Sequence, residues 1–175
     1  SYRESEPGDY AYIMFDEVEN LGRKVFGFWI INAQFDDPST KFTLPIIDFP
    51  AQINYGDSWT TTAEYPNSLL GIPAIYTEVQ SFDVDAYGYL ELPELGVLEC
   101  LRINSVKDFS AAIDFNGTGT FTNIDRQFAR IYYWLVPGKG IAAQMVSEPS
   151  GNPVSEQFKL ATMFQRMFET NKVAK

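Results

Sequence analysis

The chain has 175 residues, of which 45% are hydrophobic and 15% aromatic, and its 13 basic and 23 acidic side chains give a formal net charge of −10. This length suits one domain with a hydrophobic core, so we expect residues 1–175 to form a single β domain. The acidic balance and the lack of a Lys/Arg cluster argue against nucleic acid and anionic membranes as partners.

Histidine is absent and Cys100 is the single cysteine. Within one chain this excludes a Ser-His-Asp triad, a Cys-His dyad, a disulfide and a zinc site built on histidine or on four cysteines. Cys100 lies in the run Leu98–Leu101, and we expect it to be a small buried hydrophobe rather than a reactive thiol.

The first residue and the hydropathy of the chain bear on whether it has a membrane segment or has been processed. No apolar stretch approaches the about 18 residues that a membrane helix needs, and the first residue is Ser1 rather than Met. We expect a soluble fragment or a processed mature protein without a transmembrane segment, any signal peptide having been removed.

Period-two alternation between turns predicts strands over the first third of the chain. The run from Tyr10 to Val18 alternates and is followed by a turn at 19–22, and a longer strand is expected over 25–35, ending at the break 36–39. Residues 42–49 contain Pro45 and are closed by Pro50, which predicts an edge strand or an extended connection.

The middle of the chain repeats this pattern. A turn at 55–57 leads into a strand, a loop is expected at 66–73, and a β-bulge is expected between Val79 and Phe82, where the apolar phase changes from odd to even positions. The expected strands are 58–65, 75–84, 89–92 and 97–106, the last three separated by turns at 85–88 and 93–96.

Asn116-Gly117 is the strongest hairpin signal, because a two-residue turn that matches strand twist favours these residues. It predicts a hairpin of 109–115 with 118–124, followed by strands 128–136 and 140–147 around a turn at Pro137-Gly138. Asn116-Gly117-Thr118 also fits the N-glycosylation sequon, but the hairpin explains it sufficiently.

Residues 153–170 fit both a helix that begins after Asn152-Pro153 and a strand in which Phe158, Phe164 and Phe168 fall on one face. The strand is favoured. With about ten strands and frequent turns, the sequence predicts an antiparallel all-β fold, either a β-sandwich or a curved half-barrel.

A metal site was considered at Asp83–Gly88, which has the D-x-D-x-x-G opening of an EF-hand calcium loop. Asp83, Asp85 and Glu94 are the candidate ligands. Tyr87 replaces a further oxygen ligand and no helical pattern flanks the segment, so a hairpin with Tyr87-Gly88 near its tip is favoured. We expect no metal and no cofactor.

Paired carboxylates can hydrolyse glycosides without histidine. The candidates for a carboxylate-dependent glycan-active enzyme lie near predicted turns: Asp36, Asp37, Asp83, Asp85, Glu91 and Glu94. An acidic chain places many carboxylates at turns by chance, so we favour solvated loop charge and expect no enzymatic activity.

Exposed aromatic side chains can stack on sugars or peptides. The candidate ligand-binding residues are Trp59, Tyr87, Tyr132 and Trp134. Tyr89 and Tyr133 are further aromatic residues that could form such a surface. Consecutive residues of a strand point to opposite faces, so at least one of Tyr132, Tyr133 and Trp134 leaves the main core unless both faces are covered.

Four motifs in this order carry a resemblance to a known family: YGDSW at 55–59, VDAYG-x-L-x-LP at 84–93, LR at 101–102 and YYW-x-x-PG at 132–138. Over residues 45–147 the chain resembles a β-rich domain of exported and surface proteins of Bacteroidota-type bacteria, often found in type IX-secreted proteins. The resemblance implies an all-β fold and export to the periplasm, cell surface or extracellular space. It supplies no catalytic residues.

A weaker likeness is to the curved half-barrels of LolA-type lipoprotein carriers, which enclose an apolar cavity. The sequence-based hypothesis is an exported, non-catalytic binding or interaction module, an acidic accessory subunit of a surface or outer-membrane assembly. Its partner is a protein at the cell surface, a glycan or an apolar ligand. The alternatives are a carrier of a lipid or apolar ligand and the glycan-active enzyme.

Overall fold

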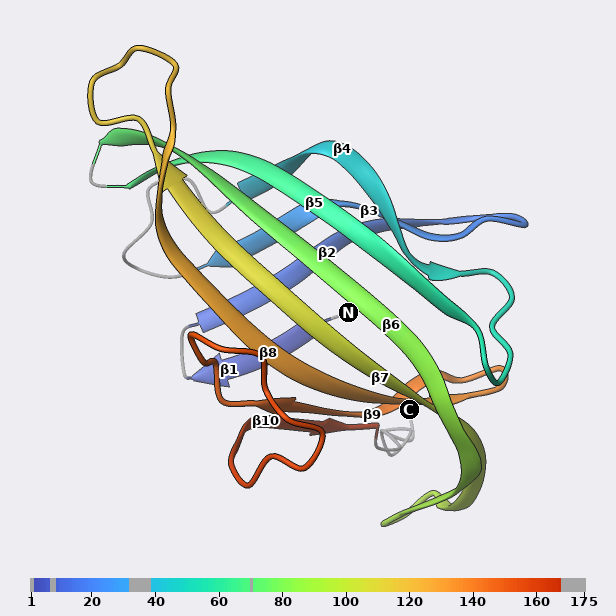
Figure 1. Ribbon diagram of the computed structural model, residues 1–175. Coiled ribbons are helices and arrows are strands. Elements are labelled where there is room, and N and C mark those ends of the chain that lie inside the picture. The colour runs from blue at the N-terminus through green and yellow to red at the C-terminus, as the bar shows by residue number, and fades with distance from the viewer. Residues whose placement is uncertain (1, 7–8, 32–38, 70, 168–175) are drawn as a thin grey trace. The chain divides into compact units, whose positions relative to one another are not determined.

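The computed structural model describes residues 2–6, 9–31, 39–69 and 71–167, with side chains for 13–28, 40–69 and 71–167. These residues form ten strands and no helix, which confirms the all-β prediction (Figure 1). The strands are β1 (Tyr2–Glu6), β2 (Asp9–Val18), β3 (Gly22–Ile31), β4 (Ser39–Pro50), β5 (Ser58–Leu69), β6 (Ile72–Leu92), β7 (Gly96–Ile113), β8 (Thr122–Val136), β9 (Gly140–Ser147) and β10 (Ala161–Arg166).

The strands form two sheets, one in the order β1-β2-β3-β4 and one in the order β10-β9-β8-β7-β6-β5. The ladders within the first sheet, and those of β9 with β8 and β10, are antiparallel. The connections at 70–71, 93–95 and 114–121 are too short for a parallel crossover of about a dozen residues, so β5–β8 are antiparallel too.

The chain gathers into two compact units. The first contains residues 1–53, 61–79 and 108–126, and the second contains 54–60, 80–107 and 127–175. Strands β5–β8 contribute residues to both units.

In the first unit, β4 is the last strand of its sheet, as the prolines predict. Val25 pairs with Ile46 and Gly27 with Lys41, so residues 42–45 lie opposite a single residue of β3. Pro45 falls in this interruption, where its missing N–H removes no ladder bond. Asp36 and Asp37, two of the candidate carboxylates, lie outside the described residues.

The predicted loop at 66–73 is wrong, because β5 continues through Pro66 to Leu69 and only residues 70–71 connect it to β6. β5 ends its sheet, and an edge strand tolerates proline since its outer N–H groups have no partner within the sheet. Pro66 and Asn67 therefore lie within the strand and do not end it.

The turn predicted at 85–88 is also wrong, because β6 runs without a break from Ile72 to Leu92. Neither the EF-hand loop nor a hairpin tip at Tyr87-Gly88 forms there. The change of apolar phase expected between Val79 and Phe82 does not appear in the burial, since Ala74, Gln80, Phe82 and Val84 are all buried at even positions.

The two-residue hairpin at Asn116-Gly117 is wrong, since β7 reaches Ile113 and an eight-residue loop, 114–121, leads to β8. The buried Asp114 carboxylate organises this loop by accepting backbone N–H groups of Gly119 at 2.7 Å, Thr118 at 3.2 Å and Asn116 at 3.3 Å. These bonds hold the pKa of Asp114 below its usual value. A side-chain-centred loop thus replaces the tight turn.

The turn at Pro137-Gly138 is confirmed and joins β8 to β9. The strand favoured for the C-terminal segment is confirmed in part as β10, Ala161–Arg166, which pairs with β9. Phe158 precedes this strand in a loop, and Phe168 lies outside the described residues.

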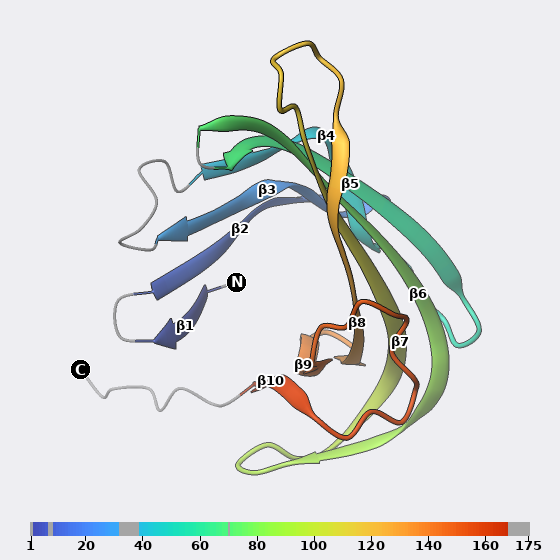
Figure 2. The ribbon, with the colours of Figure 1, turned by 60° about the vertical axis from the view of Figure 1, so that its left-hand side comes forward.

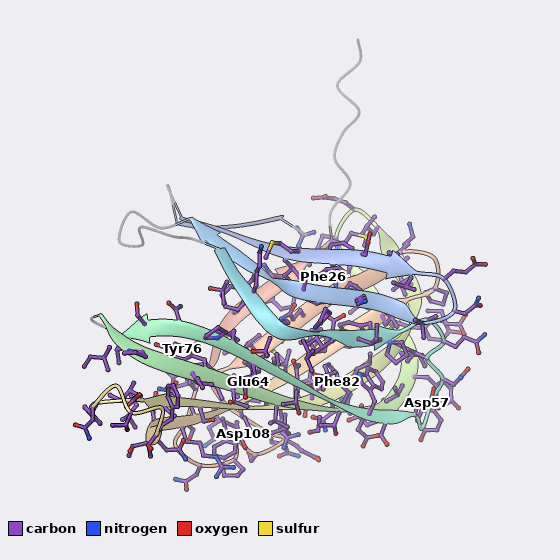
Figure 3. The ribbon with its side chains drawn as sticks, turned by 90° about the horizontal axis from the view of Figure 1, so that it is seen from above. Phe26, Asp57, Glu64, Tyr76, Phe82 and Asp108 are labelled. Atoms are coloured by element: carbon purple, nitrogen blue, oxygen red, sulfur yellow. The ribbon has the colours of Figure 1, made fainter. Side chains whose placement is uncertain are left out.

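Aromatic side chains dominate the packing of each unit. In the first, rings from β3 to β7 contact one another in succession: Phe28, Phe42, Tyr65, Tyr76 and Phe109. Burial raises the pKa of Tyr65 well above its usual value. In the second unit, Trp59 stacks on Phe82 with ring centroids 4.8 Å apart. Figure 3 labels Tyr76 and Phe82 in these two groups.

Candidate ligand-binding surface

Near its tip, the β6–β7 hairpin of the second unit has one packed face and one exposed face. Leu92 and Cys100 form a buried cluster with Val136 and Ala142, and Leu90 and Leu98 pack against it. The residues that alternate with these on the two strands are exposed on the opposite face: Tyr89, Glu91, Val97 and Glu99. Tyr87, two residues before Tyr89, is exposed as well. In Figures 1 and 2 this hairpin, in yellow-green, bends and projects past its neighbouring strands.

A slip in the side-chain alternation of β6 creates the exposed face. Asp85 binds Arg102 of β7, and Leu90 packs against the cluster that contains Cys100. Arg102 and Cys100 share one face of β7 because they are two residues apart. Asp85 and Leu90 therefore also share a face. Leu90 comes five positions after Asp85, so regular alternation would place the two on opposite faces. Because they share a face, a β-bulge must lie between them. Tyr89, next to Leu90, points the other way.

Tyr55 joins this face from the turn before β5. Its ring meets that of Tyr87 edge to face, with centroids 5.2 Å apart. The turn is fixed to β6 by two backbone bonds, from Gly56 N–H to Val84 O at 3.0 Å and from Val84 N–H to Asp57 O at 2.9 Å. The Asp57 carboxylate closes the turn by accepting the N–H of Asn54 at 2.7 Å.

We call Tyr55, Tyr87, Tyr89 and Val97 the tyrosine face. Their exposed fractions are 59%, 73%, 80% and 64%. Single exposed apolar residues are ordinary, whereas a group of neighbouring ones is a candidate interaction surface. Tyr87 was a candidate from sequence, whereas Tyr55 and Val97 were missed because only the paired strands bring them together.

Tyr132 and Trp134, two other candidates, lie on the opposite side of the sheet. Tyr132 is 8% exposed, and its ring lies near those of Trp134 and Phe158, at 6.3 and 6.0 Å between centroids. Its hydroxyl donates to Glu156 O at 2.9 Å. Desolvation raises the pKa of the Tyr132 hydroxyl. Tyr132 thus holds the segment that precedes β10 against the sheet.

Arg102 completes this packed cluster. Its guanidinium binds the Asp85 carboxylate through two bonds of 2.9 Å and lies 5.1 Å from the centre of the Tyr132 ring. The hydrogen bonds to Asp85 raise the pKa of Arg102. Arg130 extends the cluster by donating to Val154 O at 3.0 Å and to the Asn104 side chain at 2.6 Å.

Trp59, the remaining aromatic candidate, is half-buried. It stacks on Phe82, whose ring lies 6.3 Å from that of Tyr133. Next to this row, the buried Gln80 amide donates to Ser105 Oγ at 2.8 Å and to the Tyr133 hydroxyl at 3.0 Å. These contacts make Trp59 part of the interior packing with one partly accessible edge.

The candidate carboxylates do not converge. Asp85 is held by Arg102, while Asp83, Glu91 and Glu94 are exposed. Within the part of the chain that the structure describes, no three acidic or cysteine side chains are grouped as metal ligands. Cys100 is buried as predicted, and desolvation raises the pKa of its thiol.

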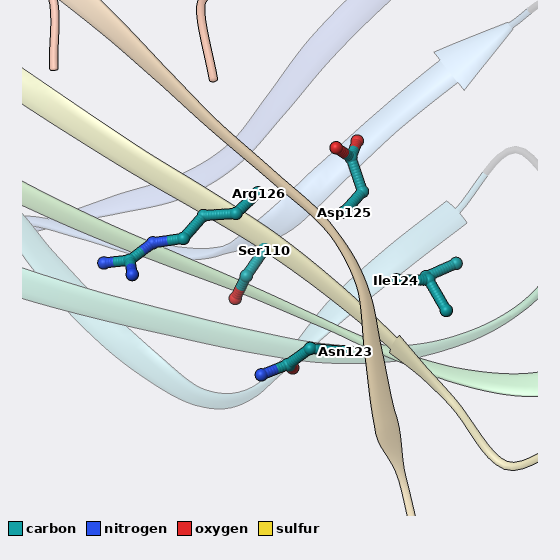
Figure 4. A pocket seen from close by; sticks show the side chains of 5 residues that line it. All are labelled: Ser110, Asn123, Ile124, Asp125 and Arg126. Atoms are coloured by element: carbon teal, nitrogen blue, oxygen red, sulfur yellow. The ribbon is translucent and has the colours of Figure 1, made fainter. Parts of the chain in front are cut away.

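A small open pocket lies in the first unit, on the end of β7 and the start of β8. Ser110, Asn123, Ile124, Asp125 and Arg126 line it (Figure 4). Arg126 is held by Asp108 through bonds of 2.9 and 2.7 Å, which lower the pKa of Asp108. The sequence did not predict this pocket.

No protein-family model, curated protein or solved structure matches this chain. The described residues contain no helix that is long and apolar enough to cross a membrane.

Proposed function

We propose that the protein is an exported, non-catalytic binding module whose ligand docks on the tyrosine face, and that it acts as an accessory component of a surface or outer-membrane assembly. The observation that carries the proposal is the exposed group of Tyr55, Tyr87 and Tyr89 on paired backbone. The export part rests on the sequence resemblance to surface domains.

The physical argument begins with the cost of exposing these rings. An aromatic side chain has about 150–250 Å² of surface to bury, and each 100 Å² of apolar surface left in water forgoes about 2.5 kcal/mol. Tyrosine is also suited to recognition, since a rigid ring and a hydroxyl supply contact area and a hydrogen bond at low entropic cost. Covering the tyrosine face with a ligand recovers part of this free energy.

A binding role is favoured over catalysis by the state of the carboxylates. Glycoside hydrolysis without histidine needs two carboxylates that flank the same bond of the substrate. Asp85 is instead bonded to the Arg102 guanidinium, and Glu91 and Glu94 are exposed to solvent.

The test compares the wild type with a Tyr87→Ala/Tyr89→Ala double variant on a glycan array and against a random-peptide phage library. A matched control is Phe115→Ala, which removes an exposed ring elsewhere. We expect at least one probe class to be retained by the wild type and by the control but lost with the double variant. Identical binding profiles of all three proteins would contradict the proposal.

Native mass spectrometry of the protein purified from its source supplies a second readout. A co-purifying protein or glycan that is lost from the double variant supports the binding module. A small apolar molecule that both proteins retain until denaturation would instead favour a lipid carrier.

A further inference from the structure

We propose that the tyrosine face binds a cationic segment of a partner protein, an extended peptide that carries Lys or Arg side chains. This inference rests on the proposed function and specifies the chemistry of the ligand.

The hairpin segment that carries Tyr87, Tyr89 and Val97 has charges of one sign. Glu91 and Glu99 lie on the same side of the hairpin as Tyr89 and Val97, because each is flanked by residues of the packed face. Between Tyr87 and Cys100 the sequence contains no Lys or Arg. Among the described ion pairs none involves Glu91 or Glu99. The surface thus presents two exposed carboxylates that take part in none of the described ion pairs.

The nearest cation along β7 is directed away from this surface. Arg102 lies on the opposite face, where Asp85 and the Tyr132 ring hold it. The whole chain carries a formal charge of −10, so the long-range field also attracts cations.

Aromatic rings and carboxylates together are the groups that recognise an organic cation. A Lys or Arg side chain over a tyrosine ring gains a cation–π contact, and the adjacent carboxylate accepts its N–H groups. The protein uses this combination within its own fold, since Arg102 binds a carboxylate and lies over the Tyr132 ring at once. The tyrosine face offers the same groups, and none of the cation–π contacts among the described residues involves its rings.

A neutral glycan fits these observations less well. It can stack on the rings, but docking it would strip water from Glu91 and Glu99 without returning an opposite charge, and a desolvated unpaired carboxylate is costly. A cationic side chain compensates this loss directly.

The experiment measures binding of a fluorescein-labelled (Lys-Ser)6 peptide by polarisation, beside a neutral laminarin oligosaccharide on the same proteins. The variants are Tyr87→Ala/Tyr89→Ala, Tyr87→Phe/Tyr89→Phe and Glu91→Gln/Glu99→Gln. Glu17→Gln/Glu19→Gln is the matched control, because it removes the same charge from exposed positions in the first unit. Circular dichroism checks that each variant is folded.

We expect the peptide to bind, and its affinity to fall as salt rises. The alanine pair should weaken binding about tenfold or more, and the glutamine pair about fivefold. The phenylalanine pair, which keeps the rings, and the Glu17/Glu19 control should stay within about twofold of the wild type.

Three results would overturn the inference, and they separate it from the proposed function. If both glutamine pairs weakened peptide binding equally and the alanine pair did not weaken it, the peptide would be attracted by the net negative charge of the chain and not by the tyrosine face. Oligosaccharide binding that needs the tyrosines but not Glu91 and Glu99 would leave the binding module standing with a neutral ligand. If neither probe binds in a tyrosine-dependent manner, and the array and phage screens also fail, both proposals are wrong.

Discussion

Tyr132→Ala should mainly lower the free energy of unfolding, whereas Tyr89→Ala should mainly weaken binding to the tyrosine face. A tyrosine side chain offers about 200 Å² to bury, and Tyr132 is 8% exposed whereas Tyr89 is 80% exposed. At about 25 cal/mol per Å², removing Tyr132 forfeits about 5 kcal/mol, at the upper end of the range of about 3–5 kcal/mol for large aromatic residues in cores. The same reasoning gives at most about 1 kcal/mol for Tyr89.

Urea unfolding followed by tryptophan fluorescence measures both free energies of unfolding, with the slope against urea as a check that the transition is unchanged. The hydrogen bond from the Tyr132 hydroxyl to Glu156 O can be isolated with Tyr132→Phe, for which a loss of about 1 kcal/mol is expected. If Tyr89→Ala destabilised the protein as much as Tyr132→Ala, Tyr89 would be a packing residue. The tyrosine face would then not be a free surface.

Three further predictions concern other parts of the chain. Cys100 should react with iodoacetamide only after unfolding, because burial blocks access and its raised pKa disfavours the thiolate; mass spectrometry of native and denatured protein checks this. Asp114, whose pKa is lowered in the fold, should stabilise its loop fully above about pH 4 and lose this effect as the pH falls through its native pKa. Asp114→Asn should therefore speed hydrogen exchange at the Gly119 amide at pH 6, and the difference from wild type should shrink in acid. Gly27→Ala should cost about 1–3 kcal/mol of stability, since a Cβ there would lie 2.1 Å from Thr40 O and the backbone has a φ of +153°; thermal unfolding measures it.

The strands could be predicted from the sequence because alternation reports burial directly. The limits of β2 and the turns at 19–21 and 137–139 follow from local residues alone. The errors have a common cause in the long strands β6, β7 and β8, where turn-forming residues occur inside paired backbone. Ladder bonds on both sides of a central strand outweigh the local preference of a Gly or Asp for a turn.

The candidate surface could be predicted only in part. Tyr87 and Tyr89 stand out as neighbours with the same phase, but their exposure depends on the slip in β6 between Asp85 and Leu90. Without that slip, alternation from Phe82 and Val84 would place Tyr89 on the same side as Asp85. A bulge leaves no reliable mark in a single sequence, because what fixes it is the register against the neighbouring strand.

The slip also divides the motif residues that carry the family resemblance. Asp85, Arg102 and Tyr132, from three of the motifs, meet in the packed cluster, and each is accounted for by a hydrogen bond or ring contact within the fold. Tyr55 and Tyr87, from two of the same motifs, meet on the opposite face and have most of their surface in solvent. Packing alone explains the first group. It does not explain the second, which is why the proposed binding site is placed on these tyrosines.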